Sequence, residues 1–109
     1  MKPQPAKNST GKVIVTIDQD LEEIIPGFLE NRRKDAASLE AALEENDLKT
    51  VRLLGHRMKG DGGGYGFQEI STIGDALEQA AIRGDRVVIQ RQTVMLVEFL
   101  SQVEVRYRR

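Results

Sequence analysis

The sequence predicts an all-α fold: an up-down-up-down antiparallel four-helix bundle with a short additional N-terminal helix and an extended N-terminal arm. Four long segments carry apolar residues at helical spacing, and only two or three residues separate one segment from the next. Such short turns make neighbouring helices antiparallel. The length of 109 residues and a composition that is 39% apolar and 30% charged are typical of one soluble globular domain.

The N-terminal region is expected to have two parts. Residues 1–12 are polar and contain two prolines, so we expect a flexible tail, and residues 13–109 would form the folded domain. Residues 13–17 are the only β-like run, and we identify no second run that could pair with it. We therefore expect an extended arm that lies along the domain, with strand-mediated dimerisation as the alternative.

The first two helices are predicted on either side of a proline. Asp18 suits an N-cap, and the acidic residues that follow it suit a first helical turn. Pro26 interrupts this segment, but proline is tolerated in the first turn of a helix. We expect a short helix over 18–25, a bend, and a long helix over 26–45. The buried face of the long helix would contain Phe28, Leu29, Ala36, Leu39 and Leu43.

Capping signals mark the remaining boundaries. Asn46 tolerates the left-handed conformation that ends a helix, Asp47 can cap the next helix, and Gly84 with Asp85 repeats this arrangement. Helices are expected over 48–65, 68–83 and 86–107, and Gly66 would end the first of them. The last two would bury Ile70, Ile73, Leu77, Ala80 and Ala81, and then Ile89, Leu96, Leu100, Val103 and Tyr107.

Composition limits the classes of function. The net charge of −1 and the five Phe and Tyr residues argue against a nucleic-acid partner, although Arg52, Arg57, Lys59 and the basic C-terminus leave a nucleic-acid-binding helical domain as an alternative. The lack of cysteine excludes disulfides and fits a reducing compartment. We find no apolar run that could cross a bilayer and no signal peptide, so we expect a cytoplasmic monomer without a membrane partner.

The helix predicted over 48–65 contains the only histidine, His56. On a wheel of about 100° per residue, His56 lies about 140° from Val51, the centre of the buried face, so its imidazole is expected to be exposed. The same outer side would carry Arg52, Leu53, Lys59, Gly60 and Gly63. A glycine inside a helix costs about 1 kcal/mol relative to alanine. An inert surface would not need that cost, whereas another protein could approach a histidine surrounded by glycines.

Two alternatives explain the glycines without a partner: the helix end could fray into a loop, or Gly62 and Gly64 could allow two helices to pack closely. The chemistry of the face still favours a phosphoryl group. A neutral imidazole is a nitrogen nucleophile near neutral pH. The neighbouring cations Arg52 and Lys59 would keep it neutral and would stabilise an attached anion. A phosphoryl group carries about two negative charges and accepts charge-assisted hydrogen bonds.

Other site chemistries lack their residues. With one histidine, no cysteine and no Glu-x-x-His pattern, no metal ligands are predicted. No serine has a recognisable base. Gly55 and Gly60 have the spacing of a phosphate-binding loop, but Asp61 stands where the loop's lysine must be.

The stretch HRMKGDGGGYGF, residues 56–67, resembles the signature of histidine phosphotransfer (HPt) domains. The signature has a phospho-accepting histidine followed by lysine, glycine and glycine three, four and ten residues later, here His56, Lys59, Gly60 and Gly66. The resemblance extends over about residues 18–107. The family often has small serine or alanine residues where this chain has Asp61 and Gly62, and the N-terminal tail and arm have no counterpart in the minimal pattern.

The resemblance implies a stand-alone phosphorelay carrier without kinase activity of its own. His56 would carry a phosphoryl group between a sensor histidine kinase, or a receiver-domain aspartate, and the aspartate of another response-regulator receiver. Lys59 would stabilise the phosphoryl group, and Arg52, Leu53, Gly60 and Gly63 would belong to the docking surface. The receiver would supply Mg²⁺, so no cofactor is expected on this chain. A helical adaptor that binds receivers without transfer is the alternative.

Overall fold

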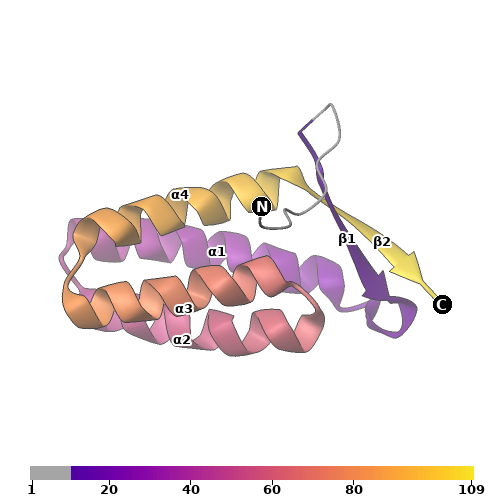
Figure 1. Ribbon diagram of the computed structural model, residues 1–109, viewed down its shortest axis with the longest axis horizontal. Coiled ribbons are helices and arrows are strands. Elements are labelled where there is room, and N and C mark those ends of the chain that lie inside the picture. The colour runs from indigo at the N-terminus through magenta and orange to yellow at the C-terminus, as the bar shows by residue number, and fades with distance from the viewer. Residues whose placement is uncertain (1–10) are drawn as a thin grey trace, which may run out of the picture.

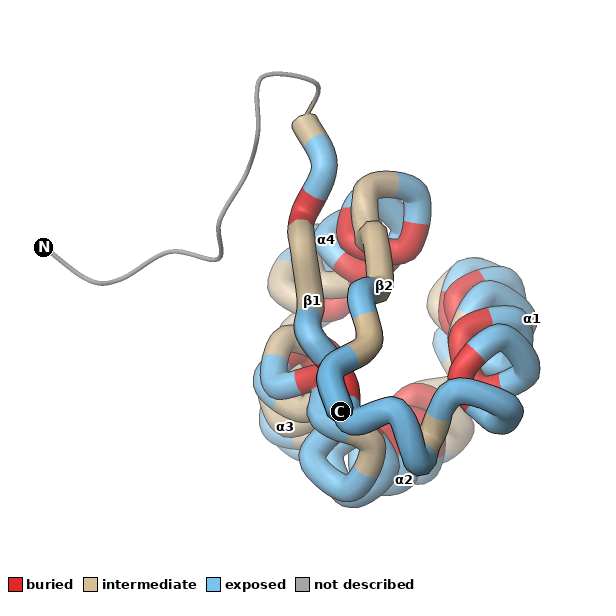
Figure 2. Tube along the Cα trace, turned by 90° about the vertical axis from the view of Figure 1, so that its right-hand side faces the viewer, coloured by how far each residue is buried: buried red, intermediate tan, exposed pale blue. Residues whose placement is uncertain are grey.

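The computed structural model describes residues 11–109 and is mostly helical. Four helices follow one another: α1 (Ile25–Glu44), α2 (Leu48–Tyr65), α3 (Gln68–Arg83) and α4 (Arg86–Gln102). They lie side by side as in a helical bundle, with α1 and α3 each between α2 and α4 (Figures 1 and 2). The predicted tail falls largely on residues 1–10, which lie outside the described residues.

The predicted bounds of α2 and α3 are confirmed because each end has a local stop or cap. Asn46 has a φ of 58°, and Gly66 and Gly84 have φ values of 89° and 72°, all in the left-handed region. Asp47 accepts hydrogen bonds from the backbone N–H and the hydroxyl of Thr50, which hold the pKa of its carboxyl below the ordinary value. Asp85 likewise accepts from the N–H of Val88 and caps α4.

The prediction for the last helix was wrong beyond residue 102. The chain leaves α4 at Gln102 and forms strand β2 (Val103–Arg108), which pairs in parallel with β1 (Val13–Asp18). Val103, Val105 and Tyr107 alternate with charged residues, which is a strand period of two, but Val103 and Tyr107 also fit the helical stripe that begins at Ile89. Because these residues also fit a helical period, the second strand was not predicted from the sequence.

The N-terminal arm therefore has its strand partner within the same chain. Val13 lies opposite Val103 and Ile17 opposite Tyr107, and both β1 side chains are buried in the core. The two strands lie across one end of the helices (Figure 1). Strand-mediated dimerisation is not needed to satisfy β1.

Of the short helix predicted over 18–25, the N-cap at Asp18 and a shorter turn are found. The chain forms only a 3-10 turn, η1 (Gln19–Leu21), in which Asp18 accepts the N–H of Asp20. α1 then begins at Ile25, with Pro26 in its first turn as predicted. The strand that precedes this segment continues to Asp18, so only residues 19–24 lie between β1 and α1.

The core fills the space between the four helices and one face of the strands. The predicted buried residues of α3 are all buried, and in α1 only Leu43 is less buried than predicted. Phe67, which precedes α3, is 1% exposed and stacks on Phe28 with ring centroids 5.4 Å apart. Within residues 11–109, the helices are too short or too polar to cross a membrane.

Candidate functional site

Glycines bring α2 and α3 into close contact. A methyl group at Gly55 would lie 2.7 Å from the backbone nitrogen of Glu78, and one at Gly62 would lie 2.5 Å from that of Ser71. On α3, a methyl group at Gly74 would lie 2.5 Å from the backbone nitrogen of Lys59. Only hydrogen fits at these three positions. The predicted role in close helix packing is confirmed for Gly62 but wrong for Gly64, where a methyl group would meet no atom within 4 Å. The short distance between the helices lets side chains of α3 reach the outer face of α2.

His56 projects from α2 to solvent and touches α3 through one ring nitrogen. Its side chain is 72% exposed, and Nδ1 lies 3.0 Å from Oε2 of Glu78, whose side chain is only 15% exposed. A carboxylate accepts hydrogen bonds, so this contact favours the tautomer of the ring that carries its proton on Nδ1. Nε2 then carries the free electron pair.

Lys59 also pairs with a carboxylate of α3. Its Nζ lies 3.1 Å from Oδ1 of Asp75, and both side chains are about half exposed. Exposed ion pairs of this kind contribute about 0–1 kcal/mol, so the ammonium group can change partners at little cost. Ser71 donates a hydrogen bond of 2.7 Å to the backbone carbonyl of Lys59 and fixes this turn of α2 against α3.

The remaining predicted site residues form the surroundings of His56 on α2. Arg52, Leu53, Gly60 and Gly63 are all exposed, and Leu53 is 50% exposed. A methyl group at Gly60 would meet no atom within 4 Å, and one at Gly63 only the hydroxyl of Ser71 at 3.9 Å. Packing within the chain does not require glycine at these two positions, so the open surface beside His56 is available for contact with another molecule.

The sequence did not identify Asp75 and Glu78 as members of the site. Both carboxylates lie on α3, three residues apart, which is the spacing of neighbours on one helix face. Gly74 immediately precedes them, and a glycine in a helix interior signals close backbone approach. A glycine inside a helix, followed by two carboxylates on one helix face, was the sequence signal that could have identified these two residues. The described residues contain no cluster of histidine and carboxylates that could hold a metal ion.

A comparison with protein families gives this geometry its context. A family model described as Hpt domain matches residues 23–105, which include all four helices and the first residues of β2. The chain belongs to the Hpt domain family. Comparisons with curated proteins and with solved structures gave no match.

Membership in the Hpt family implies histidine phosphotransfer in phosphorelay signalling, and Hpt domains interact with kinases and receiver domains. His56 is the only histidine of this Hpt domain. It is also exposed, next to a lysine and on a surface that glycines leave open.

Proposed function

We propose that this Hpt domain carries a phosphoryl group on Nε2 of His56. The observation that carries the proposal is the hydrogen bond between Nδ1 and Glu78, because it leaves the electron pair of Nε2 directed away from α3. The partners would be a sensor histidine kinase and response-regulator receiver domains, and the fold that presents His56 would be an up-down-up-down antiparallel bundle. The lack of cysteine supports a reducing, cytoplasmic location.

In the proposed transfer, the Nε2 electron pair attacks the phosphorus of an aspartyl phosphate on a receiver. The Nε2–P bond forms as the P–O bond to the aspartate breaks, and the bonding pair returns to the aspartate as a carboxylate. The imidazole becomes positively charged because Nδ1 keeps its proton. Glu78, 3.0 Å away, stabilises that charge and so acts as a positioning and charge-balancing residue. The reverse steps deliver the group to another receiver.

Lys59 would stabilise the phosphoryl group by exchanging its partner. In the unphosphorylated protein, its ammonium group contacts Asp75. A phosphoryl group with about two negative charges, one helical turn away, competes with that single half-exposed carboxylate. Asp75 therefore holds Lys59 near the site and releases it when the anion arrives.

The docking surface would surround His56 on α2. Gly60 and Gly63 leave room for the receiver's active site, while Leu53 offers an apolar contact and Arg52 a positive charge. The receiver would bring Mg²⁺, which neutralises phosphoryl oxygens during the transfer. The chain itself would supply the nucleophile, one cation and the docking face, without kinase activity of its own.

The first test is transfer of label from a receiver phosphorylated on its aspartate. Label should appear on this chain in a form that is labile to acid and stable to alkali, as expected of a phosphorylated nitrogen. The His56→Gln variant should stay unlabelled while its circular dichroism matches the wild type. Label that persists in this variant would rule out His56 as the carrier.

A further inference from the structure

The outward face of α4 is unusually apolar. Seven large apolar side chains are exposed among the described residues, and four of them lie on this one helix: Val87, Val94, Met95 and Val97. Their exposed fractions run from 44% to 66%. Single exposed apolar residues are normal on a monomer, but a group on one helix indicates a contact surface.

The centre of this face is a straight stripe. Val87, Arg91, Val94 and Glu98 follow one another at spacings of four, three and four residues, so they lie on one side of the helix. The buried residues of α4 occupy the opposite side. The stripe, with Met95 and Gln90 beside it, lines an open groove of about 420 Å³.

The charges of the stripe are arranged symmetrically. Along the helix, Arg91 lies as many positions before the midpoint between Val94 and Met95 as Glu98 lies after it. Neither side chain takes part in an ion pair with another of residues 11–109. A surface with opposite charges at equal distances from an apolar centre is complementary to itself under a two-fold rotation.

We propose that a second copy of this chain docks on the α4 face, with the two α4 helices antiparallel about a two-fold axis between Val94 and Met95. Arg91 of each copy then lies opposite Glu98 of the other, and Val94 of each copy meets Met95 of the other between the two charge pairs. The sequence alone predicts a monomer. The self-complementary face of α4 is the reason to revise that expectation.

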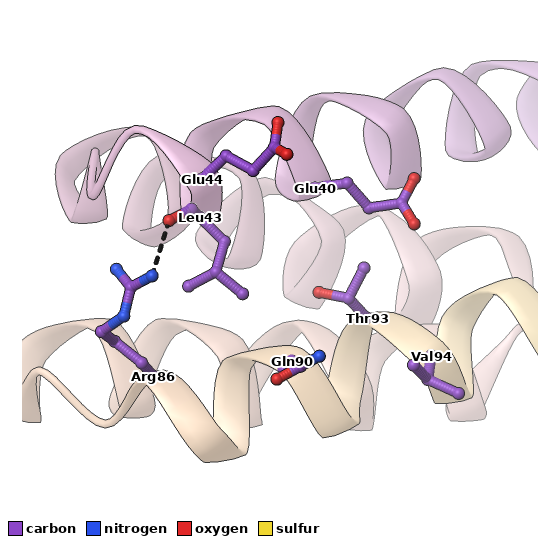
Figure 3. A pocket seen from close by; sticks show the side chains of 7 residues that line it. All are labelled: Glu40, Leu43, Glu44, Arg86, Gln90, Thr93 and Val94. Carbon is purple, nitrogen blue, oxygen red and sulfur yellow. Dashed lines mark hydrogen bonds between the residues drawn. The ribbon is translucent and has the colours of Figure 1, made fainter.

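The dimer would leave the phosphotransfer face free. α4 packs between α1 and α3, whereas α2 lies across the bundle from it (Figure 2). On the α1 side, the face borders a groove of about 520 Å³, which is lined by Gln90 and Val94 of α4 and by Glu40 and Glu44 of α1 (Figure 3). These carboxylates give the contact a polar rim. Both copies could therefore exchange phosphoryl groups while paired.

The size of the face sets the expected strength. A helix of 17 residues is about 25 Å long, and a contact of one such helix buries less than the ~800 Å² per partner of a typical stable interface. The dimer should therefore dissociate on dilution. Arg86 adds nothing to the contact, because its guanidinium already donates to the Leu43 carbonyl and the Asn46 side chain.

Sedimentation equilibrium over a range of concentrations tests the apolar centre. The mean mass of the wild type should rise with concentration from the 12.2 kDa of one chain toward twice that value. Val94→Glu should stay at one chain mass. Leu53→Glu is the matched control, since Leu53 is 50% and Val94 52% exposed, and Leu53 lies on α2. It should associate like the wild type. A wild type that remains at one chain mass throughout, or a Val94→Glu variant that associates normally, overturns the proposal.

Charge reversal tests the pairing itself. Arg91→Glu and Glu98→Arg should each remain at one chain mass, because like charges then face each other across the axis. A mixture of the two variants should associate again as a one-to-one complex, since every facing pair is then opposite in charge. No recovery in the mixture contradicts the antiparallel arrangement. A wild type that associates only after removal of residues 1–10 would assign the face to that segment instead and also overturn the proposal.

Discussion

Replacement of Glu78 by glutamine tests how α3 prepares His56. The isosteric glutamine side chain keeps an acceptor near Nδ1 but loses the negative charge that lies 3.0 Å from the ring. Hydrogen bonds to charged groups contribute about 1.5–3 kcal/mol and neutral ones about 0.5–1.5 kcal/mol. Because His56 is 72% exposed, we take the lower part of this difference, about 1 kcal/mol. That energy corresponds to transfer about five times slower for Glu78→Gln.

The assay is the rate of phosphoryl transfer from a phosphorylated receiver, measured together with the ¹⁵N NMR spectrum of His56. The wild-type ring should carry its proton on Nδ1, and Glu78→Gln should shift part of the population to the other tautomer. Glu40→Gln, an exposed substitution on α1, is the control and should change neither measurement. An unchanged transfer rate in Glu78→Gln, or a wild-type ring protonated on Nε2, would refute the reasoning.

Three further predictions concern the residues around His56. Gly62→Ala should destabilise the fold by about 1–3 kcal/mol, because its methyl group would lie 2.5 Å from the backbone of Ser71. Gly60→Ala should instead stabilise the fold by up to about 1 kcal/mol, because its methyl group meets no atom within 4 Å. Urea unfolding measures both changes. Lys59→Ala should shorten the half-life of the phosphorylated protein by up to about fivefold, and a half-life equal to the wild type would exclude a role for the ammonium group. Asp75→Asn should lengthen that half-life, because Lys59 no longer has a competing partner; a shortened one would contradict the proposed exchange.

The fold could be predicted wherever local signals and periodicity agree. The ends of α2 and α3 lie at their predicted residues because caps and left-handed residues mark them. The end of α4 could not be predicted in this way, since Val103 and Tyr107 satisfy both a helical and a strand period. What decides between the two is the pairing with β1, far earlier in the chain, where Val13 lies opposite Val103. A contact of that range leaves no local signal.

Of the site residues, only those on α2, the helix that carries His56, could be predicted from the sequence. The helical wheel of α2 placed His56 and its neighbours outside, and each of them is exposed. The carboxylates of α3 could not be found because their reach depends on how closely two helices pack. Gly55, Gly62 and Gly74 together set the distance between the two helices. A helical wheel describes a single helix and therefore gives no information about that distance.

The central claim is that His56 passes its phosphoryl group on. The direct measurement is to phosphorylate the purified domain, remove the donor, and mix it with an unphosphorylated receiver domain and Mg²⁺. The account predicts that label leaves His56 and appears on the receiver in a form labile to alkali, as an acyl phosphate is. A receiver that binds the domain and yet acquires no label would contradict the account and would instead indicate an adaptor without transfer.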